Sequence, residues 1–182
     1  MKRLPTFVVL MAILVAGSSC AQAQRAPAPP STYHSIALPS PKPLKGFPSD
    51  FQLPPVWLLV DTSAVLATSG TFQYKGASAI ATSPQLIADL TTTLVPAPQS
   101  LRCIISSTTV TTVRAHTSDW MGASESGYQG NARELDVQTT RDGQFTVVTL
   151  EPPANHSNQL LVIEVTFTEG TVNYMWRLNP KE

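Results

Sequence analysis

The sequence predicts an all-β protein, and three observations lead to this prediction. β-Branched and aromatic residues alternate with polar residues in short runs between residues 56 and 178, a pattern typical of strands that bury one face. Turn signals separate these runs, and helical periodicity is confined to one short stretch. About eight strands in roughly 130 residues favour an antiparallel β-sandwich, immunoglobulin-like or jelly-roll-like, with one short helix.

The first half of this region is predicted to contain four strands. They are expected over residues 56–60, 71–75, 102–106 and 108–115, with a turn at Ser69-Gly70 before the second. The run from Val56 to Val60 is apolar throughout and ends at Asp61, which indicates a buried strand followed by a polar turn.

The last third of the chain predicts two hairpins. One is expected around Asp142-Gly143 and the other around Glu169-Gly170, where glycine accepts a positive φ. In the final run, residues 172–178, apolar residues share one face and mostly polar residues the other. If this final strand lies at a sheet edge, it is also a candidate for pairing with another chain.

One short helix is predicted between the two halves. Ser83 is a suitable N-cap and Pro84 suits the first helical position. Apolar residues follow at helical spacing: Leu86, Ile87, Leu90 and Leu94.

The first 23 residues are typical of a secretory signal peptide of bacterial type. Lys2 and Arg3 precede an apolar run over residues 7–15, and Ala21-Gln22-Ala23 provides a small-residue cleavage site. The apolar run is too short to span a bilayer, and no later segment predicts a transmembrane span. We therefore expect an exported protein, periplasmic or secreted.

Cys20 offers an alternative end to this leader. Cleavage before it and lipidation of its thiol would make the protein a membrane-anchored lipoprotein. Nine prolines in residues 24–55 then predict an extended linker, whose few apolar residues can dock on the domain. The β-sandwich domain is expected over residues 56–182. It retains Cys103, which we interpret as a small buried hydrophobe.

Charge and metal-ligand patterns exclude several functions. Without Lys2 and Arg3 the chain has ten basic residues against twelve acidic ones, with no basic cluster, so nucleic acid is not an expected partner. The three histidines, His34, His116 and His156, have no metal-ligand spacing. We therefore predict neither a metal site nor a cofactor.

One motif points to an enzyme. The run from Leu58 through Asp61 to Ala64 resembles the segment that carries the catalytic aspartate of retropepsin-like aspartic proteases, with Ser63 in place of the family's glycine. The resemblance implies that two such aspartates, one from each copy of a dimer, share a proton and activate water. It is the one concrete version of the alternative function, an exported hydrolase.

A long polar loop holds the candidate binding residues. Trp120, Asp119 and Tyr128 lie in or beside it, and such residues stack on sugar rings or hold protein partners. The alternative is that Trp120 folds back to cap the core. We therefore expect a non-enzymatic exported domain that acts in binding or assembly at the bacterial cell envelope, with a protein or carbohydrate partner.

Overall fold

The computed structural model describes residues 35–80, 90, 92–95, 100–120, 131–151 and 158–180. The expected signal peptide and Cys20 lie outside these residues, as do Tyr33, His34 and His156. The strands are β1 (Val56–Val60), β2 (Ser63–Leu66), β3 (Thr68–Tyr74), β4 (Ala77–Ala79), β5 (Thr92–Val95), β6 (Leu101–Ile105), β7 (Val110–Asp119), β8 (Arg133–Leu135), β9 (Val137–Asp142), β10 (Phe145–Leu150), β11 (Gln159–Phe167) and β12 (Gly170–Pro180).

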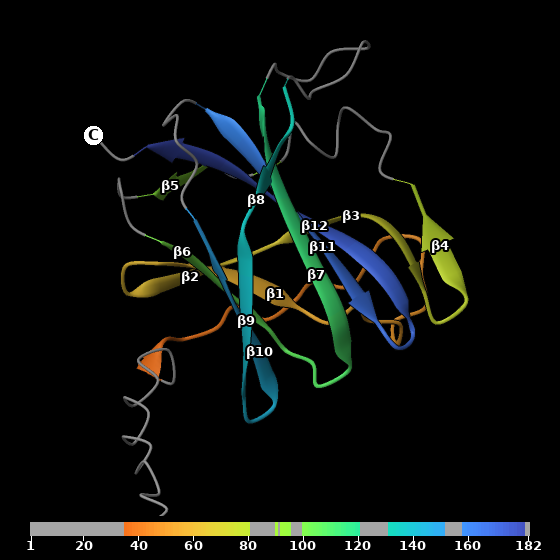
Figure 1. The fold of residues 1–182 in the computed structure, drawn as a ribbon. Coiled ribbons are helices and arrows are strands. Elements are labelled where there is room, and N and C mark those ends of the chain that lie inside the picture. Colours follow the sequence, from red (N-terminus) through yellow and green to blue (C-terminus); the bar gives the residue numbers. More distant parts are fainter. Residues whose placement is uncertain are drawn as a thin grey trace, which may run out of the picture. The chain divides into compact units, whose positions relative to one another are not determined.

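The strands form two sheets, which confirms the predicted all-β sandwich (Figure 1). Sheet A has the order β2-β1-β6-β10-β9, and sheet B has the order β4-β3-β12-β11-β7-β8 with β5 beside the end of β12. Every pairing is antiparallel except that of β5 with β12. No helix in the described ranges has the length and apolar character to cross a membrane.

The main core lies between the two sheets. Alternate residues of each strand point into it, because successive side chains of a strand face opposite sides. Sheet A contributes Val56, Leu58, Cys103, Ile105 and Val148, and sheet B contributes Leu161, Ile163, Val165, Val172, Tyr174 and Trp176. The predicted division of the last strand into an apolar and a polar face agrees with this arrangement.

Two strands continue from one sheet into the other through a single residue. Ala67 joins β2 of sheet A to β3 of sheet B, and Asp136 joins β8 of sheet B to β9 of sheet A. Trp176 ties the sheets near the first of these corners, since its Nε1 donates a 3.0 Å hydrogen bond to the Val65 carbonyl. A buried indole needs such a partner for its N–H.

The proline-rich segment packs on the domain from residue 36 onward. Ile36 and Leu38 contact the outer-face cluster of sheet A, and Leu53 is buried in the main core. Phe47 and Phe51 stack with centroids 5.1 Å apart, and Phe47 lies 5.4 Å from Phe72 of β3. The apolar residues of this segment, foreseen as able to dock on the domain, do so wherever they are described.

The two predicted hairpins are present. β9 pairs with β10 around Gly143 and Gln144, and β11 pairs with β12 around Thr168 and Glu169. Gly170 has a φ of +142°, and a Cβ there would lie 2.0 Å from the Gln73 carbonyl oxygen. Glycine is therefore required at this position by both conformation and space.

The helix prediction is wrong at its C-terminal end. Leu94 lies in β5, which pairs in parallel with β12 through Leu94 opposite Asn179. The β-branched run before it favours a strand once the end of β12 offers a hydrogen-bonding edge. Most of the predicted helix, including Ser83 and Pro84, lies outside the described residues.

Two other expectations are also wrong. Ser69 and Gly70 lie inside β3 and form no turn, because this part of β3 pairs with β12 through Ser69 opposite Tyr174. The final strand is not an edge, since β12 lies between β3 and β11.

Candidate functional site

Two of the candidate binding residues, Asp119 and Trp120, lie where β7 ends and β11 begins. Asp119 lies opposite Gln159 in the pairing of these strands. The Trp120 amide donates a 3.0 Å hydrogen bond to the Asn158 carbonyl, which extends the pairing by one step. We call Asp119, Trp120, Asn131, Asn158 and Arg177 the polar end of the sandwich.

Trp120 is half-buried, and its ring contacts both an apolar cluster and a cation. It packs against the outer-face cluster of sheet B, which consists of Leu90, Leu160, Val162 and Met175. The Arg177 guanidinium lies 5.1 Å from its ring centroid, a cation–π contact. Arg177 is oriented a second time by Asn158, whose Oδ1 accepts a 2.9 Å hydrogen bond from Nε. Trp120 thus covers the cluster and holds a guanidinium at the same time.

Asp119 is the last residue of β7. Its Oδ2 accepts a 3.4 Å hydrogen bond from the Asn131 amide, which comes from the chain just before β8. Tyr128, the third predicted binding residue, lies outside the described residues. The structure therefore brings Asp119 and Trp120 to one end of sheet B, together with Arg177 and Asn158, which the sequence did not indicate.

Buried polar groups line the inner face beside this end. Gln159 and Thr93 are 6% and 5% exposed, and Gln159 Oε1 and Thr93 Oγ1 have no hydrogen-bond partner among the described residues. Leu178 of β12 lies between them, since it pairs with Gln159 of β11 on one side and with Thr93 of β5 on the other. Buried polar atoms are usually paired in proteins. Acceptors of this kind are satisfied by a donor from water or from a bound molecule.

A second polar network lies at the β11–β12 turn. Glu169 Oε2 accepts hydrogen bonds from the Thr168 hydroxyl at 2.8 Å and the Thr109 hydroxyl at 2.9 Å. These bonds lower the pKa of Glu169, with Thr168 the larger cause. The network joins the β6–β7 connection to the β11–β12 turn, so we interpret it as structural.

Asp61, the aspartate of the protease-like motif, lies at the tip of the β1–β2 hairpin. Val60 pairs with Ser63, which leaves Asp61 and Thr62 as a two-residue turn. Asp61 is exposed and has a φ of +51°, a conformation that aspartate tolerates. The Ser63 hydroxyl donates to the Val60 carbonyl at 2.9 Å. The geometry is that of a strand ending in a polar turn.

Cys103 and His116 lie on different layers of the sandwich. Cys103 is fully buried in the main core, and burial raises the pKa of its thiol. His116 alternates with the inward-facing Ala115 and so lies on the outer face of sheet B. Among the described residues, no group of three or more His, Cys, Asp and Glu side chains is arranged to hold a metal ion.

A hollow beside β2, β3 and β12 has a volume of about 270 Å³. It is lined mainly by apolar residues: Pro39, Ala64, Val65, Leu66, Thr68, Leu90, Met175 and Trp176. Pockets for drug-sized ligands usually measure about 300–1,000 Å³. This hollow is therefore a minor feature beside the polar end.

Comparison of the chain with protein-family models, with curated proteins and with solved structures returns no match. The functional proposal therefore depends on the chemistry of the described residues and on the leader sequence.

Proposed function

We propose that the chain is an exported, non-enzymatic β-sandwich domain that acts in binding or assembly at the bacterial cell envelope. The observation that carries this proposal is the polar end, where the ends of β7, β8, β11 and β12 bring together an aromatic ring, a guanidinium, a carboxylate and two amides. Trp120 and Arg177 lie on the outer face of sheet B, and Asp119, opposite Gln159, lies on the inner face. Recognition residues are commonly placed at the ends of a rigid β-scaffold.

The arrangement of the polar end suits a ligand rich in hydrogen-bonding groups. The Arg177 guanidinium is fixed by Trp120 on its face and by Asn158 at Nε, so little side-chain entropy is lost when it binds. The Asp119 carboxylate and Asn131 amide offer acceptors and a donor close together. Such sets pair with the hydroxyl groups of a carbohydrate or with a polar protein segment.

The Trp120 ring has a supporting role in this proposal. Its contacts with the outer-face cluster and with Arg177 occupy it, so it positions the guanidinium instead of stacking on a sugar. Export is supported by the leader over residues 1–23, with lipidation at Cys20 as the anchored version. Intact mass spectrometry of the protein from its native cell fractions distinguishes a chain starting at Gln24 from one carrying acyl groups on Cys20.

Binding is tested by titrating the isotope-labelled domain with soluble peptidoglycan fragments and a panel of neutral and amino-sugar oligosaccharides. Expected shifts in the amide spectrum map to Asp119, Asn131, Asn158 and Arg177. Asp119→Asn and Arg177→Met should abolish them. Asp61→Asn is the matched control, because it makes the same charge change on an exposed aspartate of the β1–β2 turn.

Two results count against the proposal. One is a set of shifts that survives both Asp119→Asn and Arg177→Met, which would place any binding elsewhere. The other is cleavage of a peptide library between acid and neutral pH that Asp61→Asn abolishes, which would establish the hydrolase alternative. Circular dichroism of each variant shows whether the fold is retained.

A further inference from the structure

One edge of β7 is open over half of its length. β11 pairs with β7 from Val110 to Asp119 on one side, and β8 pairs with Ala115–Thr117 on the other. In the described part of the chain no strand pairs with residues 110–114 on that second side. An open strand edge presents N–H and C=O groups to any other extended chain.

The sequence at this edge is prone to strand pairing. Residues 108–113 read Thr-Thr-Val-Thr-Thr-Val, six residues with no charge, proline or glycine. Short segments of high β-propensity and low charge are those that self-associate through their backbones. In the open stretch the one charge of β7 is that of Arg114, which follows this segment and lies on the outer face beside the inward-facing Ala115.

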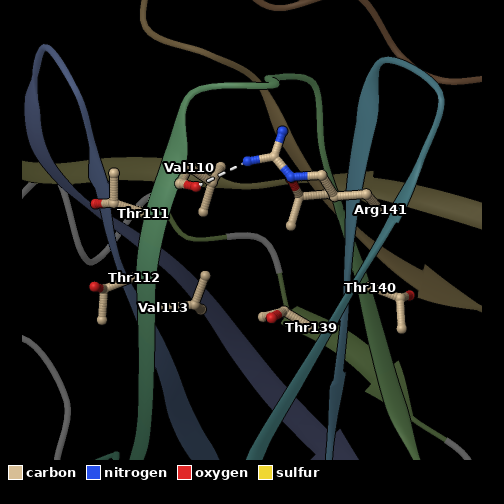
Figure 2. Close-up of a pocket in the computed structure, with 8 residues that line it drawn as sticks. Val110, Thr111, Thr112, Val113, Thr139, Thr140 and Arg141 are labelled. Carbon is tan, nitrogen blue, oxygen red and sulfur yellow. Dashed lines mark hydrogen bonds between the residues drawn. The ribbon is translucent and has the colours of Figure 1, made fainter.

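Arg141 covers this edge from the other sheet. It lies on β9, beside the open part of β7, with its side chain directed across the gap between the sheets (Figure 2). One terminal nitrogen donates to the Thr108 carbonyl and the other donates to the Val110 carbonyl at 3.2 Å. Its guanidinium thus binds carbonyls at the edge where another strand would pair.

The gap itself is too small for another strand while Arg141 spans it. Its volume is about 90 Å³. It is lined by residues of both strands and of β10: Val110, Thr111, Thr112, Val113, Thr139, Thr140, Arg141 and Thr146. The side chain of Arg141 is directed inward, because Arg141 lies opposite the buried Thr146. An inward-pointing charge at a sheet edge is a known protection against edge pairing.

The segment is also complementary to itself. Residues 110–113 read Val-Thr-Thr-Val, the same in both directions. In an antiparallel pair with a two-fold axis between Thr111 and Thr112, Val110 of one copy faces Val113 of the other. Val110 and Val113 both pack against the main core, because an irregularity at Thr111 in the pairing with β11 places them on the same face of β7. The two-fold pair therefore sets valine against valine.

We propose that Arg141 is a gatekeeper that keeps the open edge of β7 from pairing with the same edge of a second copy of the chain. The proposal is independent of the function assigned to the polar end, because β7 carries the two features at opposite ends. Loss of the guanidinium frees the edge carbonyls and removes the charge that a second copy would otherwise have to bury.

Sedimentation velocity of the mature chain tests the proposal. The wild-type protein should remain monomeric, and Arg141→Met should show a mass that rises toward that of a dimer with concentration. Arg141→Lys should remain monomeric, because it keeps an inward charge. Arg133→Ala should also remain monomeric, since it removes the same charge from an exposed residue of β8.

Hydrogen exchange identifies the surface that pairs. In Arg141→Met the amides of residues 110–114 should gain protection as concentration rises, whereas the edge strands β2 and β4 should not change. If methionine prevents folding, Arg141→Gln tests the same point with a neutral side chain. A folded neutral variant that stays monomeric, or one that dimerises without protection of residues 110–114, overturns the proposal.

Discussion

The indole Nε1 of Trp57 donates a 2.9 Å hydrogen bond to the carbonyl oxygen of Pro39, so the proline-rich segment closes the outer face of sheet A. Trp57 is only 5% exposed, although it points away from the main core. Ile36 and Leu38, two apolar residues of the same segment, pack against the cluster that contains Trp57. These residues therefore belong to the folded unit.

This contact predicts a loss of stability when the segment is shortened. A chain that starts at Lys42 should be less stable than one that starts at Ser35 by about 2–3 kcal/mol, because it lacks the burial by Ile36 and Leu38 and the hydrogen bond to Trp57. Urea denaturation followed by circular dichroism measures the difference. Ala37→Ser, a change at the exposed residue between them, should leave the midpoint in place. Equal midpoints for the two chain lengths would contradict the role of the segment.

Gly170 is predicted to be intolerant of substitution. Gly170→Ala places a Cβ 2.0 Å from the Gln73 carbonyl oxygen, so the β3–β12 pairing must shift. We expect a loss of about 3 kcal/mol in the free energy of unfolding. Gly143→Ala is the matched control, because Gly143 also has a positive φ, +59°, but a Cβ added there would have nothing within 4 Å. It should cost about 1–2 kcal/mol. Thermal unfolding of both variants measures the difference, and equal losses would show that backbone conformation alone decides.

The structure agrees with the sequence where information is local. β1 has the bounds expected for it, and both C-terminal hairpins are present, because alternation and turn residues are read within a few positions. The turn predicted at Ser69-Gly70 is absent because this part of β3 pairs with β12, a strand more than a hundred residues later in the chain.

For the candidate site, too, the sequence predicts single residues but not the contacts between them. Asp119 and Trp120 were identified from their place in a polar loop, but their partners depend on pairing. Arg177 reaches Trp120 because β12 and β7 flank β11, and the bond of Trp176 to Val65 joins residues 111 positions apart. The bridge from Arg141 to Val110 spans 31 positions and two sheets. No periodicity in the sequence encodes such contacts.

The carboxyl of Glu169 is predicted to titrate below its ordinary range. The hydroxyls of Thr168 and Thr109 donate to its charged form and lower its pKa. Thr109→Val should raise that pKa toward the ordinary value, as measured by carboxyl-carbon NMR. Thr111→Val is the control, because the Thr111 hydroxyl donates to the Thr166 carbonyl and does not contact Glu169.

The sign of the stability effect follows from the same lowered pKa. The contribution of Glu169 is present above the ordinary glutamate pKa and is lost as pH falls through the lowered one. The acid side of the unfolding profile should therefore be steeper for the wild type than for Thr109→Val. Identical carboxyl titrations in the two proteins would show that the Thr109 bond does not persist in solution.

Cys103 is predicted to make the fold sensitive to alkaline pH. Burial in the main core raises the pKa of its thiol, so the folded state holds the proton more tightly than the unfolded state. Its contribution is complete below the pKa of an unfolded cysteine, about 8.5, and is lost above it at about 1.4 kcal/mol per pH unit. Burial, aided by the charge of Tyr74, raises the pKa of Tyr174 in the same direction, so a second loss should begin near about pH 10.

Urea denaturation across this range separates the two groups. Cys103→Ala should lower stability by a nearly constant amount below about pH 8 and should lack the decline between about pH 8.5 and 10. The decline above that range should remain, because Tyr174 is unchanged. In the folded wild type the thiol should also resist alkylation at about pH 8, since the thiolate is the reactive form. Parallel stability profiles for the two proteins, or rapid alkylation of the folded wild type, would mean that Cys103 is not held in a dry core.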